Sequence, residues 1–183
     1  MKNIIRHTLK LSLWMSIFIV CTSKVSANSI NKISDTLGYT IYIFLAPDCP
    51  ISQQYTRTIN QFYEKYHNEF EFIVYMGNKN TFRNKRSQLK FKSTYKFLPA
   101  IKTDINNHKA RELKATVTPE VYIVNKEGVI LYHGAIDNWF FALGKTRPII
   151  TSFYLEDAIQ NIIKGESIQV PRTTAIGCFL EYK

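Results

Sequence analysis

The feature that most constrains the fold is a cysteine placed where an apolar run ends and a helical pattern begins. The segment Thr40–Leu45 is apolar, β-branched and aromatic, which predicts a buried strand. Apolar residues then recur at near-helical spacing from Ile51 to Tyr66 and predict an amphipathic helix. Between the two lies Ala46–Ser52, with the sequence APDCPIS, so Cys49 is expected at or near the helix N-cap. Free backbone N–H groups and the helix dipole favour a thiolate there, which predicts a reactive cysteine.

The first 27 residues have the pattern of a secretory signal peptide. Met1–Lys10 is basic, Leu11–Val20 is apolar, and Val25–Ala27 offers a small-residue cleavage site. We therefore expect residues 1–27 to be removed and the protein to be secreted or periplasmic. An uncleaved membrane anchor is the alternative, and lipid attachment at Cys21 is another; membrane contact is expected only in these two cases.

Two cysteines, Cys49 and Cys178, remain once the signal peptide has gone. Exported chains with two cysteines commonly form a disulfide, which here is either a static staple or a redox couple. The sequence leaves both open, together with the possibility that Cys178 packs as a small apolar residue. No paired C-x-x-C motif is present, so neither a zinc ribbon nor a c-type haem site is expected, and we expect no cofactor or metal.

The charge of the chain is concentrated in one basic stretch. The formal net charge is +10, and loss of the four basic and no acidic residues in positions 1–27 leaves +6. Much of the excess lies in Lys79–Lys96, which contains no acidic residue. A solvated helix face or loop is the simpler interpretation, and a docking surface for an acidic partner or anionic head groups is the alternative. Nucleic acid is not an expected partner, because the chain carries no nucleic-acid-binding motif.

The rest of the chain predicts one α/β domain, residues 38–166, after a polar lead-in at 28–37 and before a tail at 167–183. A strand at Phe70–Met76 after the cysteine-bearing helix implies a right-handed parallel crossover. Five further elements and one connection are expected. They are a partly helical Asn78–Phe97, an extended Leu98–Asp104, a helix over Asn106–Ala115, an antiparallel hairpin of Val121–Val124 and Val129–His133, an aromatic, Gly-containing connection at Asn138–Arg147, and an amphipathic helix from Leu155 to Gly165.

Several motifs in this order resemble the thioredoxin superfamily. Ala-Pro-x-Cys-x-x-Ser, ending at Ser52, is similar to its active-site turn, and Val117–Val121 is similar to its Thr-Pro segment. Together with Tyr132-x-Gly134-x-x-Asp137 and the late Gly177-Cys178, they resemble secreted redoxins of the alkyl-hydroperoxide-reductase/thiol-specific-antioxidant group. The resemblance covers about Gly38 to Phe179. It implies a thioredoxin-like three-layer fold, with a central mixed β-sheet flanked by helices, and a cis proline that faces the cysteine.

The resemblance and the positions of the residues together suggest roles for five residues. Cys49 is the expected nucleophile, and Thr118 and Pro119 are expected to guide the backbone of an extended substrate. Ser52 stands where a thioredoxin has its second cysteine. It lies one helical turn beyond Cys49, so its hydroxyl or backbone N–H is placed to donate a hydrogen bond to the Cys49 thiolate, and a plain capping-turn serine is the alternative. Because a serine cannot close a local disulfide, release of a substrate needs Cys178 or an external thiol.

The function implied is an exported thiol–disulfide oxidoreductase with antioxidant relatives. Its expected partners are protein or small-molecule disulfides and thiols, together with an external thiol reductant. Two alternatives stay open: a peroxiredoxin-like peroxide reductase that uses Cys49, and a non-catalytic copper- or partner-binding module that keeps the fold. A histidine next to a reactive cysteine can bind copper or shuttle protons, and His133 near the hairpin end is the candidate beside Cys49; a surface histidine is the simpler interpretation.

Overall fold

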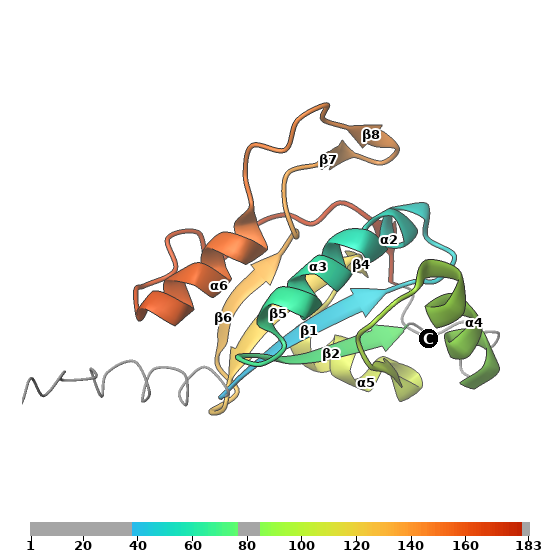
Figure 1. Cartoon of the computed structure of the whole chain (residues 1–183), viewed down its shortest axis with the longest axis horizontal. Helices are drawn as coiled ribbons and strands as arrows, with labels where there is room; N and C mark the ends of the chain where they lie inside the picture. The colour runs from blue at the N-terminus through green and yellow to red at the C-terminus, as the bar shows by residue number, and fades with distance from the viewer. Residues whose placement is uncertain (1–37, 77–84, 181–183) are drawn as a thin grey trace, which may run out of the picture.

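A computed structural model describes residues 38–76 and 85–180 of the chain (Figure 1). The expected signal peptide, the lead-in at 28–37 and Cys21 lie outside the described residues, as does the first part of the basic stretch. None of the helices within the described ranges is long and apolar enough to cross a membrane.

The centre of the fold is a mixed five-stranded sheet in the order β3-β2-β1-β5-β6. The first three strands in the chain are parallel, whereas β5 runs antiparallel to β1, and β6 antiparallel to β5. The central strand β1 contains the apolar run before the cysteine, so Ile43 lies between Val74 of β2 and Val121 of β5. The strand bounds are β1 Tyr39–Leu45, β2 Glu71–Met76, β3 Ile101–Thr103, β5 Glu120–Asn125 and β6 Ile130–Gly134.

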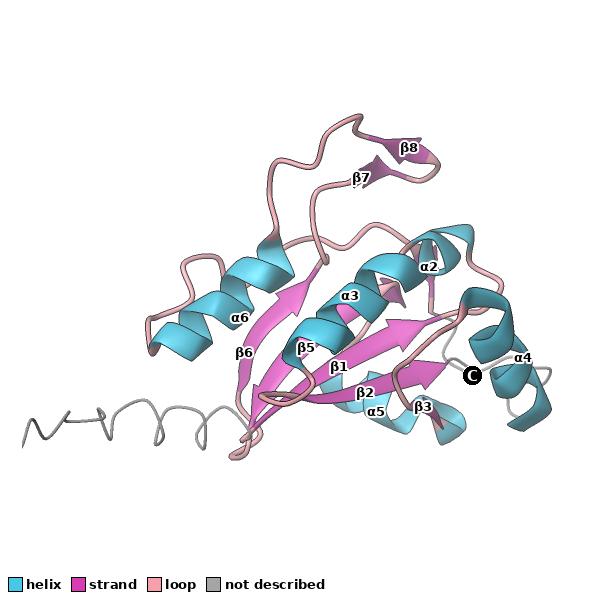
Figure 2. Ribbon diagram, in the orientation of Figure 1, coloured by secondary structure: helices cyan, strands magenta, loops and turns pink. Residues whose placement is uncertain are grey.

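Helices cover both faces of this sheet, which makes the three layers expected from the sequence (Figure 2). One face carries α2 (Pro50–Gln54), α3 (Thr56–Tyr66) and α6 (Tyr154–Lys164) over the larger apolar core. The other face carries α5 (His108–Leu113) over a smaller core that includes Phe44 and Tyr122. Successive side chains of β1 point to opposite faces of the sheet and therefore pack into two cores, one on each side.

The helices α3 and α6 lie side by side and are joined by polar contacts at one end. Lys65 Nζ lies 2.6 Å from Glu156 Oε1, and the Tyr66 hydroxyl donates to the same oxygen at 2.9 Å. The α6 helix ends at Gly165, whose φ of 70° is the left-handed conformation that glycine adopts at helix C-termini. The helix predicted up to this glycine is confirmed.

Two segments differ in detail from the sequence prediction. The helix expected to be continuous from Ile51 to Tyr66 is interrupted at Tyr55, where the Thr56 hydroxyl donates to the Gln53 carbonyl at 2.6 Å and competes with the helical pattern. The connection after Asn138, for which the sequence predicted no strand, contains a small hairpin, which projects from the body of the domain (Figure 1). Its strands are β7 (Phe140–Ala142) and β8 (Lys145–Thr146). The remaining elements are α4 (Lys85–Tyr95), a 3-10 turn at Ile105–Asn107, and a two-stranded sheet of β4 (Val117–Thr118) and β9 (Cys178–Phe179).

Candidate active site

Cys49 lies at the junction that the sequence predicts. It is the N-cap residue of α2, and Pro50 follows at the first helical position. Its backbone N–H donates to the Ala46 carbonyl at 3.0 Å, and its carbonyl accepts from Gln53 N–H at 3.0 Å, so a tight turn and the first helical turn both hold it. The side chain is only 1% exposed. The Cys49 sulfur can therefore react with a substrate only if a segment that covers it moves away.

Ser52 is buried in the same turn, and its hydroxyl has a structural partner. The Ala46 N–H donates to Ser52 Oγ at 3.2 Å, and the neighbouring Gln53 side chain donates to the Pro47 carbonyl at 2.7 Å. These two contacts tie the loop before Cys49 to the first turn after it. The hydrogen bond from Ser52 to a Cys49 thiolate, expected from the sequence, stays a prediction.

The Thr-Pro segment lies against Cys49, as the resemblance implies. The Thr118–Pro119 peptide bond is cis. Cys49 Sγ lies 3.2 Å from the Thr118 carbonyl oxygen, a contact that becomes a hydrogen bond when the sulfur carries a proton. Such a bond favours the thiol over the thiolate, opposing the helix N-terminus. The carboxylate of Glu120 is buried below this segment and accepts from the Thr116 N–H at 2.8 Å, an anchor that the sequence analysis did not identify.

The structure joins Cys49 and Cys178 in a disulfide, with Cα atoms 6.0 Å apart. That separation lies within the usual range for disulfides in proteins. The two residues are 129 positions apart, so the pairing depends entirely on where the tail runs. Of the interpretations left open by the sequence, the disulfide is the one that the structure contains. Cys178 also packs, partly buried, against the larger core.

The tail reaches Cys49 by pairing as a short strand. This strand, β9 (Cys178–Phe179), is antiparallel to β4 (Val117–Thr118), with Thr118 opposite Cys178. The Leu180 N–H donates to the Thr116 carbonyl at 2.9 Å and extends the pairing by one residue. The segment expected to guide a substrate backbone is therefore occupied by the protein's own tail.

An earlier part of the tail is fastened to β6. The backbone of His133 donates to the Pro171 carbonyl and accepts from Thr173 N–H, each at 3.0 Å. The Thr173 hydroxyl accepts from Ala135 N–H at 2.9 Å and lies 2.8 Å from the Tyr132 hydroxyl. Figure 1 shows the tail crossing from the end of α6 towards α2 and β4. Pro171–Thr173 thus fixes the tail several residues before its cysteine.

Buried Tyr55 and Asp137 form a polar contact between the junction of α2 and α3 and the segment that follows β6. The Tyr55 hydroxyl donates to Asp137 Oδ1 at 2.5 Å, and the Trp139 N–H donates to the same oxygen at 2.8 Å. Burial raises the pKa of Asp137, and these two hydrogen bonds partly offset that rise. Burial and the Asp137 carboxyl raise the pKa of Tyr55. Asp137 was noted in the sequence only as part of a motif, whereas Tyr55 gave no sign of its partner 82 residues away.

His133 does not form a metal site with neighbouring residues. Its ring stacks on Tyr122 with centroids 5.4 Å apart, and its Nδ1 is buried. Burial and the nearby Arg172 cation lower the pKa of His133. Within residues 38–76 and 85–180, no group of three histidine, cysteine, aspartate or glutamate side chains is placed to hold a metal ion.

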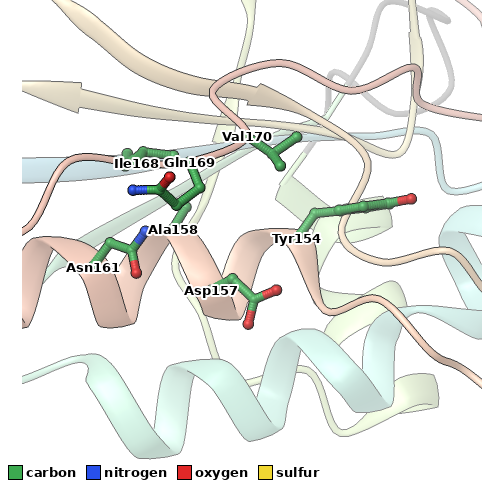
Figure 3. A pocket seen from close by; sticks show the side chains of 7 residues that line it. All are labelled: Tyr154, Asp157, Ala158, Asn161, Ile168, Gln169 and Val170. Carbon is green, nitrogen blue, oxygen red and sulfur yellow. The ribbon is translucent and has the colours of Figure 1, made fainter.

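A pocket of about 240 Å³ lies between α6 and the start of the tail (Figure 3). Neither cysteine lines it, and its walls mix apolar groups with Asp157 and two amides. The lining residues are Tyr154, Asp157, Ala158, Asn161, Ile168, Gln169 and Val170.

Comparison with solved structures shows the fold. An uncharacterized conserved protein from Geobacillus kaustophilus superposes with a TM-score of 0.66 and 18% identity, over 80% of this chain and 78% of that chain. A hypothetical protein from Sinorhizobium meliloti gives a TM-score of 0.63 and 16% identity, over 84% of each chain. A putative thiol:disulfide interchange protein DsbE from Chlorobium tepidum gives 0.51 and 16%, over 72% and 84%. No family model and no curated protein sequence matches the chain. The predicted thioredoxin-like fold is confirmed.

Proposed function

We propose that this chain is a thiol–disulfide oxidoreductase whose redox couple is Cys49 and Cys178. The observation that carries the proposal is the disulfide between a cysteine at a strand-to-helix junction and a cysteine on a short terminal strand. A bond between a fixed residue and a terminal segment can open without unfolding the sheet, which a redox couple requires. The disulfide interchange protein among the structural neighbours agrees with this chemistry.

The proposed reaction transfers two electrons through two exchanges. The Cys49 thiolate attacks one sulfur of a substrate disulfide, a new sulfur–sulfur bond forms, and the other substrate sulfur leaves as a thiolate that takes a proton. The Cys178 thiolate then attacks Cys49 Sγ and releases the second substrate thiol. The substrate disulfide is reduced, the Cys49–Cys178 pair is oxidised, and an external thiol reductant returns the pair to its reduced form.

Several residues have proposed supporting roles. Gln53 and Ser52 hold the turn that positions Cys49, and Ser52 donates to the thiolate when the tail is displaced. The Thr118 carbonyl lies against the Cys49 sulfur, and Thr118 and Pro119 are proposed to receive the substrate backbone. The Thr118 carbonyl favours the protonated Cys49 in the resting reduced protein, because a thiol donates to it and a thiolate is repelled.

The setting of the reaction follows from the sequence. We propose that residues 1–27 direct export and that the oxidoreductase works in an extracytoplasmic compartment, where protein disulfides persist. Its substrates there are protein or small-molecule disulfides, and its activity supports thiol-dependent antioxidant protection.

Turnover of a disulfide by cysteine variants tests the proposal. Reduced protein, separated from its reductant, is mixed with excess oxidised glutathione, and release of glutathione above the protein-free rate is followed over time. C49S is expected to abolish turnover, and C178S to slow it and accumulate a mixed disulfide at Cys49. S87A is the matched control, since it is a conservative change on α4 that leaves both cysteines in place. Turnover that survives in C49S contradicts the proposal. Faster consumption of hydrogen peroxide than of disulfide, lost in C49S, would favour the peroxiredoxin-like alternative instead.

A further inference from the structure

The terminal part of the tail packs very closely on β4, more closely than a disulfide between Cys49 and Cys178 requires. We call residues 174–180 the arm and Pro171–Thr173 the clip. The clip pairs with β6, and the arm runs from it to the strand pairing of Cys178 with Thr118. The arm therefore occupies a strand edge directly beside the Cys49 sulfur.

The fit depends on a glycine immediately before the cysteine. A Cβ at Gly177 would lie 2.1 Å from the Thr118 carbonyl oxygen and 2.5 Å from its carbon. Real Cβ atoms essentially never approach backbone so closely, so any side chain here forces the two strands apart. Gly177 has no positive φ, so the requirement comes from close approach and not from backbone conformation.

Beyond the disulfide, the arm is held by little. The pairing with β4 spans two residues, the Leu180 N–H adds one hydrogen bond, and the Thr118 hydroxyl donates to the Cys178 carbonyl at 3.4 Å. Leu180 packs, partly buried, against the smaller core, whereas the Phe179 side chain is 81% exposed. Of the arm residues before Gly177, only Ile176 packs an apolar side chain on the larger core. Once the disulfide is reduced, an arm with so few contacts can leave while the clip keeps it close.

We propose that the β4 edge is a binding site for an extended peptide segment with the pattern apolar–Gly–Cys, and that the arm is an internal copy of that substrate. This inference rests on the proposed function. An exposed strand edge binds an extended peptide through backbone hydrogen bonds, and the positions of its side chains give specificity. Here the selectivity comes from the Thr118 carbonyl, which admits glycine before the reacting cysteine and excludes larger residues.

The arm and the substrate then compete for one edge during the reaction. With the arm displaced, a peptide disulfide pairs with β4, and the Cys49 thiolate attacks the peptide cysteine, expelling the other sulfur as a thiolate that takes a proton. When the arm returns, the Cys178 thiolate attacks Cys49 Sγ, and the peptide leaves as a thiolate that also takes a proton. Cleavage of the mixed disulfide and release of the peptide therefore take place as the arm replaces the peptide on β4. The clip keeps the arm close to β4 and so raises its effective concentration for this exchange.

The experiment uses the reduced C178S variant of residues 28–183, in which Cys49 is the one remaining thiol, and two synthetic peptides. One peptide has the sequence of positions 175–180, AIGCFL, and the other is AIACFL; each carries cysteamine in disulfide linkage to its cysteine. Formation of the Cys49–peptide adduct is followed by intact-mass spectrometry, with oxidised glutathione as a probe of general Cys49 reactivity. We expect AIGCFL to react at least about tenfold faster than AIACFL, because only glycine clears the Thr118 carbonyl.

Weakening the arm tests the competition. G177A in the C178S background is expected to raise the rate with AIGCFL several-fold, because the arm can no longer seat on β4. L180P in the same background removes the N–H that bonds to Thr116 and is expected to act in the same direction without touching the glycine. V129A is the control, since the Val129 side chain is exposed on the turn between β5 and β6.

The outcomes separate this inference from the proposed function. If oxidised glutathione and both peptides react equally well, the glycine selectivity is wrong and the oxidoreductase stands. If neither G177A nor L180P changes the rate while both variants stay folded by circular dichroism, the arm does not compete for the edge. If no disulfide forms an adduct at Cys49 in any variant, the proposed function itself fails.

Discussion

Removal of the Cys49–Cys178 disulfide is expected to lower the free energy of unfolding by up to about 5 kcal/mol. The bond joins residues 129 positions apart, and the chain-entropy model gives about 5 kcal/mol for a loop of that length. The effect arises mainly in the unfolded chain, because the bond reduces the number of conformations that the chain can adopt. With a urea m-value near 2 kcal/mol/M, the midpoint is expected to fall by about 2.5 M.

Urea unfolding followed by circular dichroism measures this difference. Wild type is unfolded in oxidising buffer and in dithiothreitol, alongside C49S and C178S in both buffers. Either variant removes the same loop, so both variants and the reduced wild type are expected to have similar midpoints, well below that of the oxidised wild type. Equal midpoints for oxidised and reduced wild type would refute the reasoning, since a closed loop of this length must constrain the unfolded chain.

Three further predictions test other parts of the structure. Burial and the Arg172 cation hold the pKa of His133 below 6.5, so His133 binds a proton less readily in the folded protein than in the unfolded chain. The stability that neutral His133 contributes is therefore expected to be lost as pH falls below about 6.5. R172Q is expected to raise the pKa of His133 in an NMR titration. Asp104 accepts from the backbone N–H groups of Lys109 and Ala110, each at 2.9 Å, at the start of α5, so D104A is expected to lower the unfolding free energy by about 1–2 kcal/mol in urea titrations. Ile159 of α6 is fully buried, so I159A is expected to leave a cavity that lowers the unfolding free energy by about 2–5 kcal/mol, and a smaller change would mean that α6 repacks.

The parts of the fold that sequence predicts well are those with local patterns. The apolar run of β1, the proline after Cys49 and the helical spacing beyond it act over a few residues, so the strand-to-helix junction could be placed from them. The hairpin of β5 and β6 and the helix ending at Gly165 have equally local signals. The break at Tyr55 was missed, because a threonine hydroxyl bonding back to a carbonyl leaves little trace in the periodicity.

The parts of the site that the sequence could not place depend on distant pairing. Strand β9 is two residues long, too short to show an alternating pattern, and its position is set by β4 about 60 residues earlier. From the sequence, the tail could be judged only long enough to reach Cys49. Gly177 was noted only as part of a motif, and its need to approach the Thr118 carbonyl appears only once the two strands are together. The Tyr55–Asp137 contact has the same origin, since no local rule relates these residues.

The reduction potential of the Cys49–Cys178 pair tests the central claim most directly. The protein is equilibrated in glutathione or dithiothreitol redox buffers of graded potential, free thiols are alkylated, and the oxidised fraction is read by mass. A redox couple is expected to titrate above about −300 mV, where cellular thiol systems can reduce it. A midpoint well below about −300 mV would mark the bond as a structural staple and contradict the assignment of Cys49 and Cys178 as an exchanging pair.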